Sequence, residues 1–408
     1  MEEIKNVKTS RFMRFIICGL IISIVFENFK LFSIFGAAFK IIHVILIMAI
    51  IYNLFFRKLI VKDIILGIFF LIMPAIPLYR ISEGMEWFKS YFVYFIMVMF
   101  FMTSLRPFLM EFRTNYTKYV KMFLYTIAFT QILGVIQFIC MNFLGYFFLL
   151  EFWGPFQFHH NQFGQSGGFY RAYSLFLEPS FLAWVTNTSF AVVLFLDRSV
   201  LKRKEKLLLL LLSVVTMVCT VSTSGLAIML VLIFAYILCR SKNPGKIIIS
   251  LGTVFIIMVM IVSFTDLLSP LKRIMVEINT EGTSGYERLV TPFLYIIKTF
   301  EYYPLFGRGL GQEGMVDNVG IIGRYSGVQN SLIGIFVNLG LSCLLFIIPA
   351  LRYSMKKIKK NRLWFLIFIS LVGIYASTGA WCSVDTFMFL ILMIAIGAVN
   401  AGEVQKKA

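Results

Sequence analysis

The sequence predicts an all-α polytopic membrane protein with about twelve transmembrane helices and both termini in the cytoplasm. Of the 408 residues, 59% are apolar and only 14% are charged, whereas a soluble domain of this length needs a far more polar surface. Apolar runs of roughly 17 to 25 residues recur along the chain, which is the length with which an α-helix crosses about 30 Å of hydrocarbon. We therefore expect residues 1–408 to form one membrane domain.

Each predicted span is an apolar run, and most runs are separated by short connections, as expected for helices packed as antiparallel neighbours. The first run follows a basic segment and has no small-residue cleavage pattern after it, so we expect a retained signal anchor. In chain order, the predicted spans are 12–26, 31–56, 64–78, 91–105, 122–150, 174–196, 207–221, 226–239, 247–264, 331–351, 363–377 and 384–399.

The basic residues set the predicted orientation of these spans. A formal net charge of +18 could indicate a nucleic-acid-binding protein, but the basic residues alternate with spans and form no DNA- or RNA-binding framework. With the amino terminus inside, three basic clusters face the cytoplasm, as the positive-inside rule requires. They comprise Arg57, Lys58 and Lys62; Lys202, Arg203, Lys204 and Lys206; and Lys356, Lys357, Lys359 and Lys360.

Cysteines and histidines give no sign of a disulfide framework or a metal site. The six cysteines lie mostly inside apolar runs, and the three histidines have no metal-ligand spacing to cysteines or acidic residues. The sequence also contains no P-loop. We therefore expect a protein without metal, nucleotide or other cofactor.

Two long outer connections hold most of the polar residues that are candidates for function. The first, 151–173, mixes aromatic residues, glycines, His159, His160 and Arg171, and the second, 266–330, is the longest polar stretch. Loops of this length are usually functional or disordered, and the aromatic content argues against disorder. Within the second loop, 289–303 is predicted to form an amphipathic interfacial helix.

A glycine-rich turn, PLFGRGLG at residues 304–311, follows that helix. Such a turn lets backbone N–H groups at Gly307 and Gly309, together with the Arg308 guanidinium, approach an anion closely. Glycine-rich turns are also common without a ligand, so an ordinary turn is the alternative.

Glu178 begins a predicted span in the order Glu178-Pro179-Ser180. Proline is favoured as a first helical residue, so Glu178 is a plausible helix cap that complements the positive end of the helix dipole. The functional alternative is a carboxylate near Arg171 that orients the arginine or accepts a proton.

Taken in order, five stretches resemble the O-antigen polymerase (Wzy) and O-antigen ligase superfamily of bacterial surface-polysaccharide assembly. The resemblance covers about residues 165–345 of a chain with many spans and basic inner connections. It implies a membrane glycosyltransferase of GT-C-like architecture. The stretches are Arg171-Ala-Tyr-Ser-Leu-Phe-Leu-Glu178-Pro179-Ser180, Ser222-Thr-Ser-Gly225, Glu287-Arg288, the turn 304–311, and Gln329-Asn330-Ser331 running into a span with Gly340.

The resemblance implies chemistry on sugars attached to undecaprenyl diphosphate at the outer face of the cytoplasmic (inner) membrane. In the polymerase, the growing glycan on its lipid diphosphate is the donor, and a new lipid-linked repeat unit supplies the attacking hydroxyl. Undecaprenyl diphosphate is the leaving group, so neither nucleotide nor metal is required. A chain-length regulator and a flippase are possible partners, besides membrane lipid, and nucleic acid is not one.

Arginine suits a diphosphate leaving group because it stays charged and binds phosphate oxygens bidentately. The alternative for each arginine is a surface charge paired with Glu287, Glu301 or lipid phosphate. By resemblance, the expected catalytic residues are Arg171, Glu178 and Arg288. The expected substrate contacts are His159, His160, Tyr286, Glu287, Gly307, Arg308, Gly309, Gln329 and Asn330.

The ligase branch carries a histidine just before the span at 331–351, whereas this chain has Gln329 there. Glutamine cannot take a proton at neutral pH, so this departure favours polymerase over ligase. The catalytic base stays open among Glu178, His159, His160 and Glu287.

A transporter is the alternative of a different class. Transporters tend to show internal repeats and ionisable groups near the bilayer midplane. No repeat is evident in this sequence, and Lys40, His43, Glu178 and Asp385 lie nearer span ends than centres. Aromatic residues of the outer loops, such as Trp153 and Tyr286, can stack on sugar rings or anchor the membrane interface.

Overall fold

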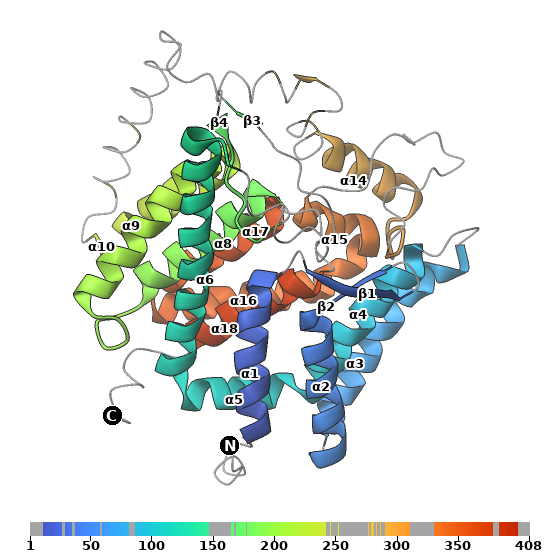
Figure 1. Cartoon of the computed structure of the whole chain (residues 1–408). Helices are drawn as coiled ribbons and strands as arrows, with labels where there is room; N and C mark the ends of the chain where they lie inside the picture. Colours follow the sequence, from blue (N-terminus) through green and yellow to red (C-terminus); the bar gives the residue numbers. More distant parts are fainter. Residues whose placement is uncertain are drawn as a thin grey trace.

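The computed structural model of the chain is a bundle of helices with two small β-hairpins (Figure 1). It describes residues 11–26, 29–34, 37–57, 59–80, 86–146, 165–166, 169–176, 178–241, 290–310, 330–377 and 383–398, and singly Gly245, Gly252, Val276, Asn279, Thr280, Thr283 and Tyr286.

The α-helices of the described residues extend along the chain from Arg11 to Ala398. They are α1 (Arg11–Ser23), α2 (Ile41–Phe56), α3 (Val61–Ile72), α4 (Glu86–Thr103), α5 (Leu105–Thr114), α6 (Tyr116–Ile139), α8 (Pro179–Phe195), α9 (Arg203–Thr220), α10 (Thr223–Arg240), α14 (Thr291–Tyr302), α15 (Ser331–Leu339), α16 (Leu344–Lys360), α17 (Trp364–Ser377) and α18 (Val384–Ala398). Short 3₁₀ segments are η1 (Ile24–Phe26), η2 (Met73–Arg80) and η6 (Gly340–Cys343), and a π-helical turn, η3 (Cys140–Leu144), extends α6. The hairpins pair β1 (Lys30–Ile34) with β2 (Ala37–Lys40) and β3 (Gln165–Ser166) with β4 (Phe169–Tyr170).

The predicted all-α class is confirmed, and helices occupy every predicted span except 247–264, which lies almost entirely outside the described residues. Within the described part of the chain, and judged by length and apolarity alone, two helical stretches are fit to cross a membrane, Tyr116–Leu144 and Ser331–Lys360. The pair Phe88–Thr103 and Leu105–Thr114, bent by 60°, adds a third if it forms one span. The number of spans and their orientation therefore stay predictions.

Two predicted spans begin later than expected. The stretch 31–40 is the β1–β2 hairpin and not a helix, because Phe32 pairs with Phe39 across the strands and their rings stack at 4.8 Å. Helix α2 then starts at Ile41. Helix α8 starts at Pro179 and not at Ser174, whose φ of 57° is incompatible with a right-handed helix.

Polar contacts tie the ends of several helices together beside α5, and we call this the α5 end of the bundle. Helices α1, α6 and α9 begin there, and α18 finishes there, so α18 runs in the opposite direction to the other three. The contacts are Arg14 to Glu111 (3.3 Å), Lys121 to Glu205 (3.5 Å) and the Tyr116 hydroxyl to the Ile396 carbonyl (3.1 Å). Helix α14 and the β3–β4 hairpin lie at the opposite end, the α14 end (Figure 1).

The α5 end also carries a basic cavity of about 730 Å³ formed by the end of α8, the start of α9 and the end of α10. Four cations and one carboxylate line it, which agrees with the basic connections that the sequence places in the cytoplasm. Its lining comprises Leu196, Asp197, Arg198, Ser199, Arg203, Lys206, Leu207, Leu210, Tyr236 and Arg240.

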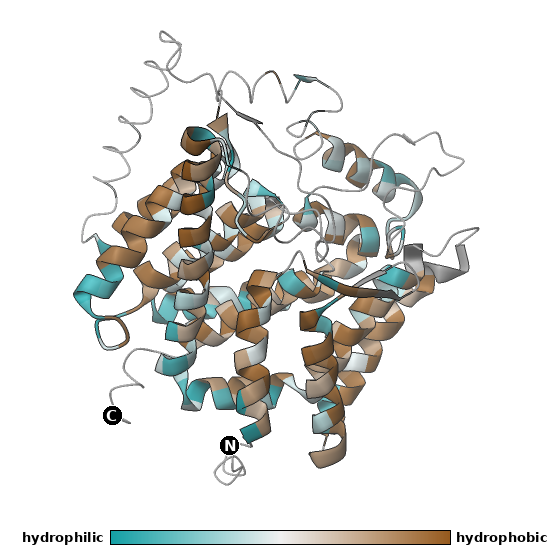
Figure 2. Cartoon of the chain, in the orientation of Figure 1, coloured by the Kyte–Doolittle hydropathy of each residue, from teal (hydrophilic) through white to brown (hydrophobic). Residues whose placement is uncertain are grey.

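Helix α8 is the centre of the bundle. Most of its side chains are buried on every face, and it packs against α6, α9, α10 and α17. The Asn187 amide donates a hydrogen bond to the Gly225 carbonyl (2.9 Å), which links α8 to α10. Helices at the periphery instead expose leucine, isoleucine and valine side chains, and Figure 2 shows that hydrophobic residues extend along most of each helix. Exposed apolar surface of this extent is suited to contact with lipid.

Candidate functional site

Arg171 lies beside the last turn of α9 at the α14 end. Its Nε donates a hydrogen bond to the Thr220 carbonyl (3.1 Å), and the next residue, Ala172, donates its N–H to the Cys219 carbonyl (3.0 Å). The carboxyl end of a helix carries partial negative charge, so it stabilises a guanidinium there. This bond directs the Arg171 Nε–H toward the carboxyl end of α9.

Two side chains of α6 hold the segment around Arg171. The Asn142 side chain exchanges hydrogen bonds with both the N–H (2.7 Å) and the carbonyl (2.9 Å) of Tyr170. The Gln137 side-chain oxygen Oε1 accepts hydrogen bonds from the N–H groups of Tyr173 (2.9 Å) and Ser174 (2.8 Å). These bonds fix an irregular backbone, including the strained Ser174, immediately before α8.

Glu178 occupies the position before α8, and Pro179 is the first helical residue, as predicted. Its backbone is extended, with φ −139° and ψ 155°, and its carboxylate is exposed. The side chain accepts a hydrogen bond from the Ser180 hydroxyl (2.8 Å) and makes no capping bond to the helix backbone. Glu178 therefore occupies the predicted cap position, but its side chain does not cap the helix. Its carboxylate lies exposed at the start of α8.

Helix α14 corresponds to the predicted interfacial helix. Tyr295 and Thr299 are buried where α14 packs on α15, whereas Phe293 and Ile297 are more than half exposed. An amphipathic helix with its apolar face turned outward is suited to lie in a membrane interface. On its polar face Lys298 and Glu301 pair at 3.0 Å, and this carboxylate raises the pKa of the Lys298 ammonium.

The glycine-rich turn after α14 docks on the backbone of a broken helix. Helix α15 ends at Gly340, so the carbonyls of Val337 and Asn338 are available to the turn. They accept hydrogen bonds from the N–H groups of Arg308 (2.8 Å) and Gly309 (3.0 Å). The N–H groups predicted to approach an anion thus bind protein carbonyls, and Gly307 donates its own N–H to Tyr303 (3.0 Å).

Arg308 is nevertheless a buried cation at this junction. Its side chain is 3% exposed, and its guanidinium carbon lies 5.4 Å from the centre of the Tyr295 ring. A cation over an aromatic face in a desolvated site is stabilised by about 2 kcal/mol. The guanidinium therefore carries the positive charge of the turn, while the glycines provide the close backbone packing.

Other predicted site residues are only partly placed. Asn330 caps α15, with its side chain accepting a hydrogen bond from the Ile333 N–H (3.3 Å). Tyr286 is described singly, with its carbonyl accepting from Val290 (2.8 Å). His159, His160, Glu287, Arg288 and Gln329 lie outside the described residues.

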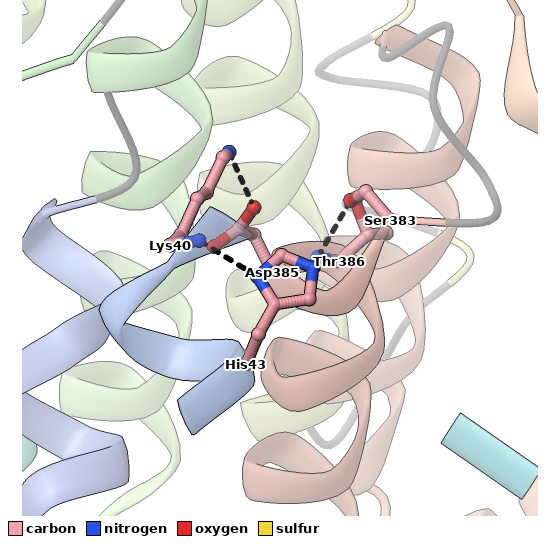
Figure 3. A network of polar contacts seen from close by, with 5 residues as sticks. All are labelled: Lys40, His43, Ser383, Asp385 and Thr386. Atoms are coloured by element: carbon pink, nitrogen blue, oxygen red, sulfur yellow. Dashed lines mark hydrogen bonds and ion pairs between the residues drawn. The ribbon is translucent and has the colours of Figure 1, made fainter. Parts of the chain in front are cut away.

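A buried polar cluster that the sequence did not single out as a site joins α2 to α18 (Figure 3). The Lys40 ammonium binds Asp385 Oδ2 at 2.9 Å, and the Lys40 N–H donates to His43 Nδ1 at 3.1 Å. Beside them, the hydroxyls of Ser383 and Thr386 lie 2.8 Å apart. Asp385 and His43 are only 4% and 5% exposed.

The sequence contained an indication of this cluster, because ionisable residues inside apolar segments, such as Lys40 and Asp385, are candidates for function by default. The sequence could not predict that these residues contact one another, since Lys40 and Asp385 are 345 positions apart. Both residues lie at the starts of their helices, and the far ends of α2 and α18 reach the α5 end, where Asn53 binds Ser104 (3.1 Å). The cluster thus belongs to the same half of the bundle as Arg171 and Arg308.

Within the described residues, no group of three histidine, cysteine or acidic side chains is arranged to hold a metal ion. The polar groups that gather toward the α14 end are instead two oriented guanidiniums, an exposed carboxylate at the start of α8, and the Lys40–Asp385 cluster. Guanidiniums suit phosphate oxygens.

A family model described as WcaD colanic acid polymerase matches residues 16–399. No curated protein matches the chain.

Proposed function

The chain belongs to the WcaD colanic acid polymerase family, and we propose that it joins repeat units carried on undecaprenyl diphosphate at the outer face of the cytoplasmic membrane. The family makes it a membrane enzyme of polysaccharide synthesis that acts as a glycosyltransferase on lipid-linked substrates. Our proposal adds three features to what the family shows. They are the lipid carrier, the face of the membrane on which the reaction takes place, and a reaction that consumes no nucleotide. The observation that supports them is that Arg171 and Arg308, each positioned by its own contact, lie in the half of the bundle toward the α14 end.

In the proposed reaction, a hydroxyl of the new lipid-linked repeat unit attacks the anomeric carbon at the reducing end of the growing glycan. The bond between that carbon and the diphosphate oxygen breaks as the new glycosidic bond forms. Undecaprenyl diphosphate leaves with the bonding electron pair, and the proton of the attacking hydroxyl is released. The donor is already activated by its diphosphate, so no nucleotide is consumed.

Negative charge grows on the diphosphate as it leaves, and preorganised cations lower the barrier most where that charge develops. Arg171 is oriented by the end of α9 and Arg308 by the Tyr295 ring. Both supply the planar guanidinium that binds phosphate oxygens in pairs. Arg288 remains a third candidate by its resemblance to the superfamily pattern.

The distribution of basic residues supports the proposal that the reaction takes place at the outer face of the membrane. The basic cavity between α8, α9 and α10 lies at the α5 end, and basic surfaces of membrane proteins face the cytoplasm. The α14 end would then face outward, with α14 lying in the interface. A lipid diphosphate carried in the outer leaflet would meet Arg171 and Arg308 at this depth.

Glu178 is the described candidate to handle the proton. Its carboxylate is exposed at the start of α8 and bound by the Ser180 hydroxyl, so it can accept a hydrogen from a substrate hydroxyl. His159, His160 and Glu287 stay alternatives for that role. Tyr286, Gln329 and Asn330 remain proposed contacts for the sugars.

The test is complementation of cells that lack this gene, followed by separation of their surface polysaccharide by size. Wild type should restore a ladder of polymers, and Arg171→Ala and Arg288→Ala at matched protein levels should leave a single repeat unit. Arg352→Ala is the matched control, because Arg352 is an exposed arginine of α16, and it should restore the ladder fully.

Two other outcomes favour the alternative functions. Loss of attached polysaccharide with polymer accumulating on the lipid carrier would show a ligase. A ladder unchanged by deletion of the gene would contradict the proposed function, and transport would then be the next activity to measure.

A further inference from the structure

The basic cavity at the α5 end gathers positive charge that no ion pair within the described residues neutralises. Arg198, Arg203, Lys206 and Arg240 line it against a single carboxylate, Asp197, so that four positive charges and one negative charge leave a formal net charge of +3. In the described part of the chain, none of these five side chains takes part in an ion pair. Like charges that line one cavity repel one another, so a bound anion would stabilise the arrangement.

Two of the four cations are held in place by neighbouring groups. The Lys206 ammonium donates a hydrogen bond to the Leu196 carbonyl (2.8 Å), where α8 ends. Arg240 lies in the last turn of α10, with its guanidinium carbon 5.6 Å from the centre of the Tyr236 ring. A cation is favourable at the carboxyl end of a helix. These contacts explain Lys206 and Arg240 structurally, and they also fix where the two charges lie.

The other two cations, Arg198 and Arg203, have no such structural explanation. Arg203 is the first residue of α9, where the positive end of the helix dipole disfavours a cation. Arg198 lies in the turn that joins α8 to α9, and both side chains are exposed. The helix N-terminus that disfavours a guanidinium favours an anion. An anion in the cavity would therefore stabilise the start of α9 and both arginines together.

An apolar stripe begins at the cavity and continues along α9. Leu207 lines the cavity, and the side chains that follow it on the same face of the helix are Leu211, Val214 and Val218. All four are exposed. At the helical rise per residue, the stripe extends over about 16 Å, which is close to half of the hydrocarbon thickness of a bilayer. The stripe is thus long enough to contact an acyl chain across one leaflet.

The cavity and the stripe together select an anionic amphiphile. Guanidiniums bind phosphate oxygens in pairs, and a cavity of about 730 Å³ has the size of a site for a small molecule. A soluble phosphate would leave the apolar stripe unused, and a zwitterionic head group would bring a further cation to a cavity that is already positive. Basic pockets between membrane helices on the cytoplasmic side are suited to anionic lipid head groups.

We propose that this cavity binds the phosphate head group of an anionic phospholipid of the cytoplasmic leaflet. Arg198, Arg203 and Arg240 bind the phosphate oxygens, and Leu207 begins the contact with an acyl chain. Because the ends of α8, α9 and α10 form the cavity, the bound lipid links the central helix to two of its neighbours. The site lies at the opposite end of the bundle from α14, so the inference does not depend on the proposed reaction.

The test measures the lipid that the purified full chain retains. Delipidated protein in detergent is mixed with phosphatidylglycerol or with phosphatidylcholine, and bound lipid is counted by native mass spectrometry. We expect wild type to retain phosphatidylglycerol and to bind phosphatidylcholine about tenfold more weakly or less, because only the first carries a net negative charge. Equal retention of the two lipids would overturn the proposal.

A triple variant, Arg198→Gln/Arg203→Gln/Arg240→Gln, tests whether the cavity is the site. We expect its affinity for phosphatidylglycerol to fall about tenfold or more, with normal abundance because all three side chains are exposed. If the triple variant fails to accumulate, the single variant Arg203→Gln replaces it, with affinity expected to fall about threefold. Unchanged affinity in an accumulated variant would overturn the proposal.

The matched control removes the same number of charges from another basic segment. Lys356, Lys359 and Lys360 are exposed at the basic end of α16, and their joint replacement by glutamine should leave retention of phosphatidylglycerol at the wild-type level. An equal loss in this control would show a general attraction of lipid to basic surfaces, and it would overturn a specific site in the cavity.

Competition separates a lipid head group from a soluble phosphate. Glycerol 3-phosphate offers the same phosphate chemistry without acyl chains, so an excess of it should not displace phosphatidylglycerol from wild type. Displacement would show that the cavity binds a soluble phosphate ester, and the lipid assignment would then be wrong. These measurements record binding and not polymer synthesis, so their outcome is independent of the complementation test.

Discussion

Gly307 and Gly340 face each other backbone against backbone, so neither position has room for a Cβ atom. A Cβ on Gly307 would lie 2.5 Å from the Gly340 nitrogen, and one on Gly340 would lie 2.5 Å from the Gly307 nitrogen. Both residues also have positive φ, 65° and 56°. The glycine-rich turn and the broken helix α15–α16 therefore form one packed junction, which holds Arg308 against Tyr295.

We expect Gly307→Ala to lower the free energy of unfolding by more than about 2 kcal/mol, since it combines left-handed strain with steric overlap. Gly145→Ala is the control, because Gly145 has a similar φ of 66° and nothing within 4 Å of a Cβ, so only the strain of about 1 kcal/mol applies. Thermal unfolding of the detergent-purified protein compares the two. Equal midpoints for both variants would show that the junction tolerates a side chain.

Arg308→Lys should retain the protein at normal abundance and reduce polymer about tenfold or more, because an ammonium lacks the planar fork that binds phosphate in pairs. Polymerisation by purified protein supplied with lipid-linked repeat units measures the effect. Tyr295→Phe is the matched control, since it keeps the aromatic face beneath the guanidinium. If the lysine variant works as well as wild type, positive charge alone suffices at this position.

Gln137→Leu should destabilise the protein by about 2 to 4 kcal/mol, because it removes the acceptor shared by the N–H groups of Tyr173 and Ser174. The variant should also produce less polymer, since the Gln137 contact positions the segment that carries Arg171. Gln131→Leu is the control on the same helix, where the side chain makes one hydrogen bond, to Ser213 (3.2 Å). A larger effect at Gln131 would contradict the assigned role of Gln137.

Single cysteines placed at Lys359 and Tyr302 in a chain without native cysteines should react from opposite sides of the membrane. Lys359 lies in the basic end of α16 and Tyr302 is exposed at the end of α14, and basic ends face the cytoplasm. A membrane-impermeant maleimide applied to intact spheroplasts should label the Tyr302→Cys variant and not the Lys359→Cys variant. Labelling of Lys359→Cys alone would reverse the predicted orientation.

The sequence predicted the helices well, because apolar runs of spanning length have few alternatives in a membrane. It misassigned 31–40, since a short apolar run fits a strand as well as a helix and only the Phe32–Phe39 contact decides between them. The break at Gly340 was also missed. That break follows from the docking of Gly307, which local periodicity does not contain.

The candidate site was predictable only where its parts are close in sequence. The order Glu178-Pro179 indicated a helix start, and the structure places one there. The role of the glycines at 307 and 309 was misjudged, because their N–H groups meet carbonyls of a helix that lies later in the chain. The pairing of Lys40 with Asp385 depends on tertiary packing, and no local pattern encodes it.

That pairing has a consequence for how the protein is made. Ribosomes synthesise Lys40 and His43 early, whereas Asp385 arrives with α18, the last described helix. Until α18 is inserted, the ammonium of Lys40 at the start of α2 has no counter-charge from Asp385, and an unpaired charge is costly in a membrane segment. The contact between these two helices can therefore form only after α18 is inserted, so it marks a late step in assembly of the bundle.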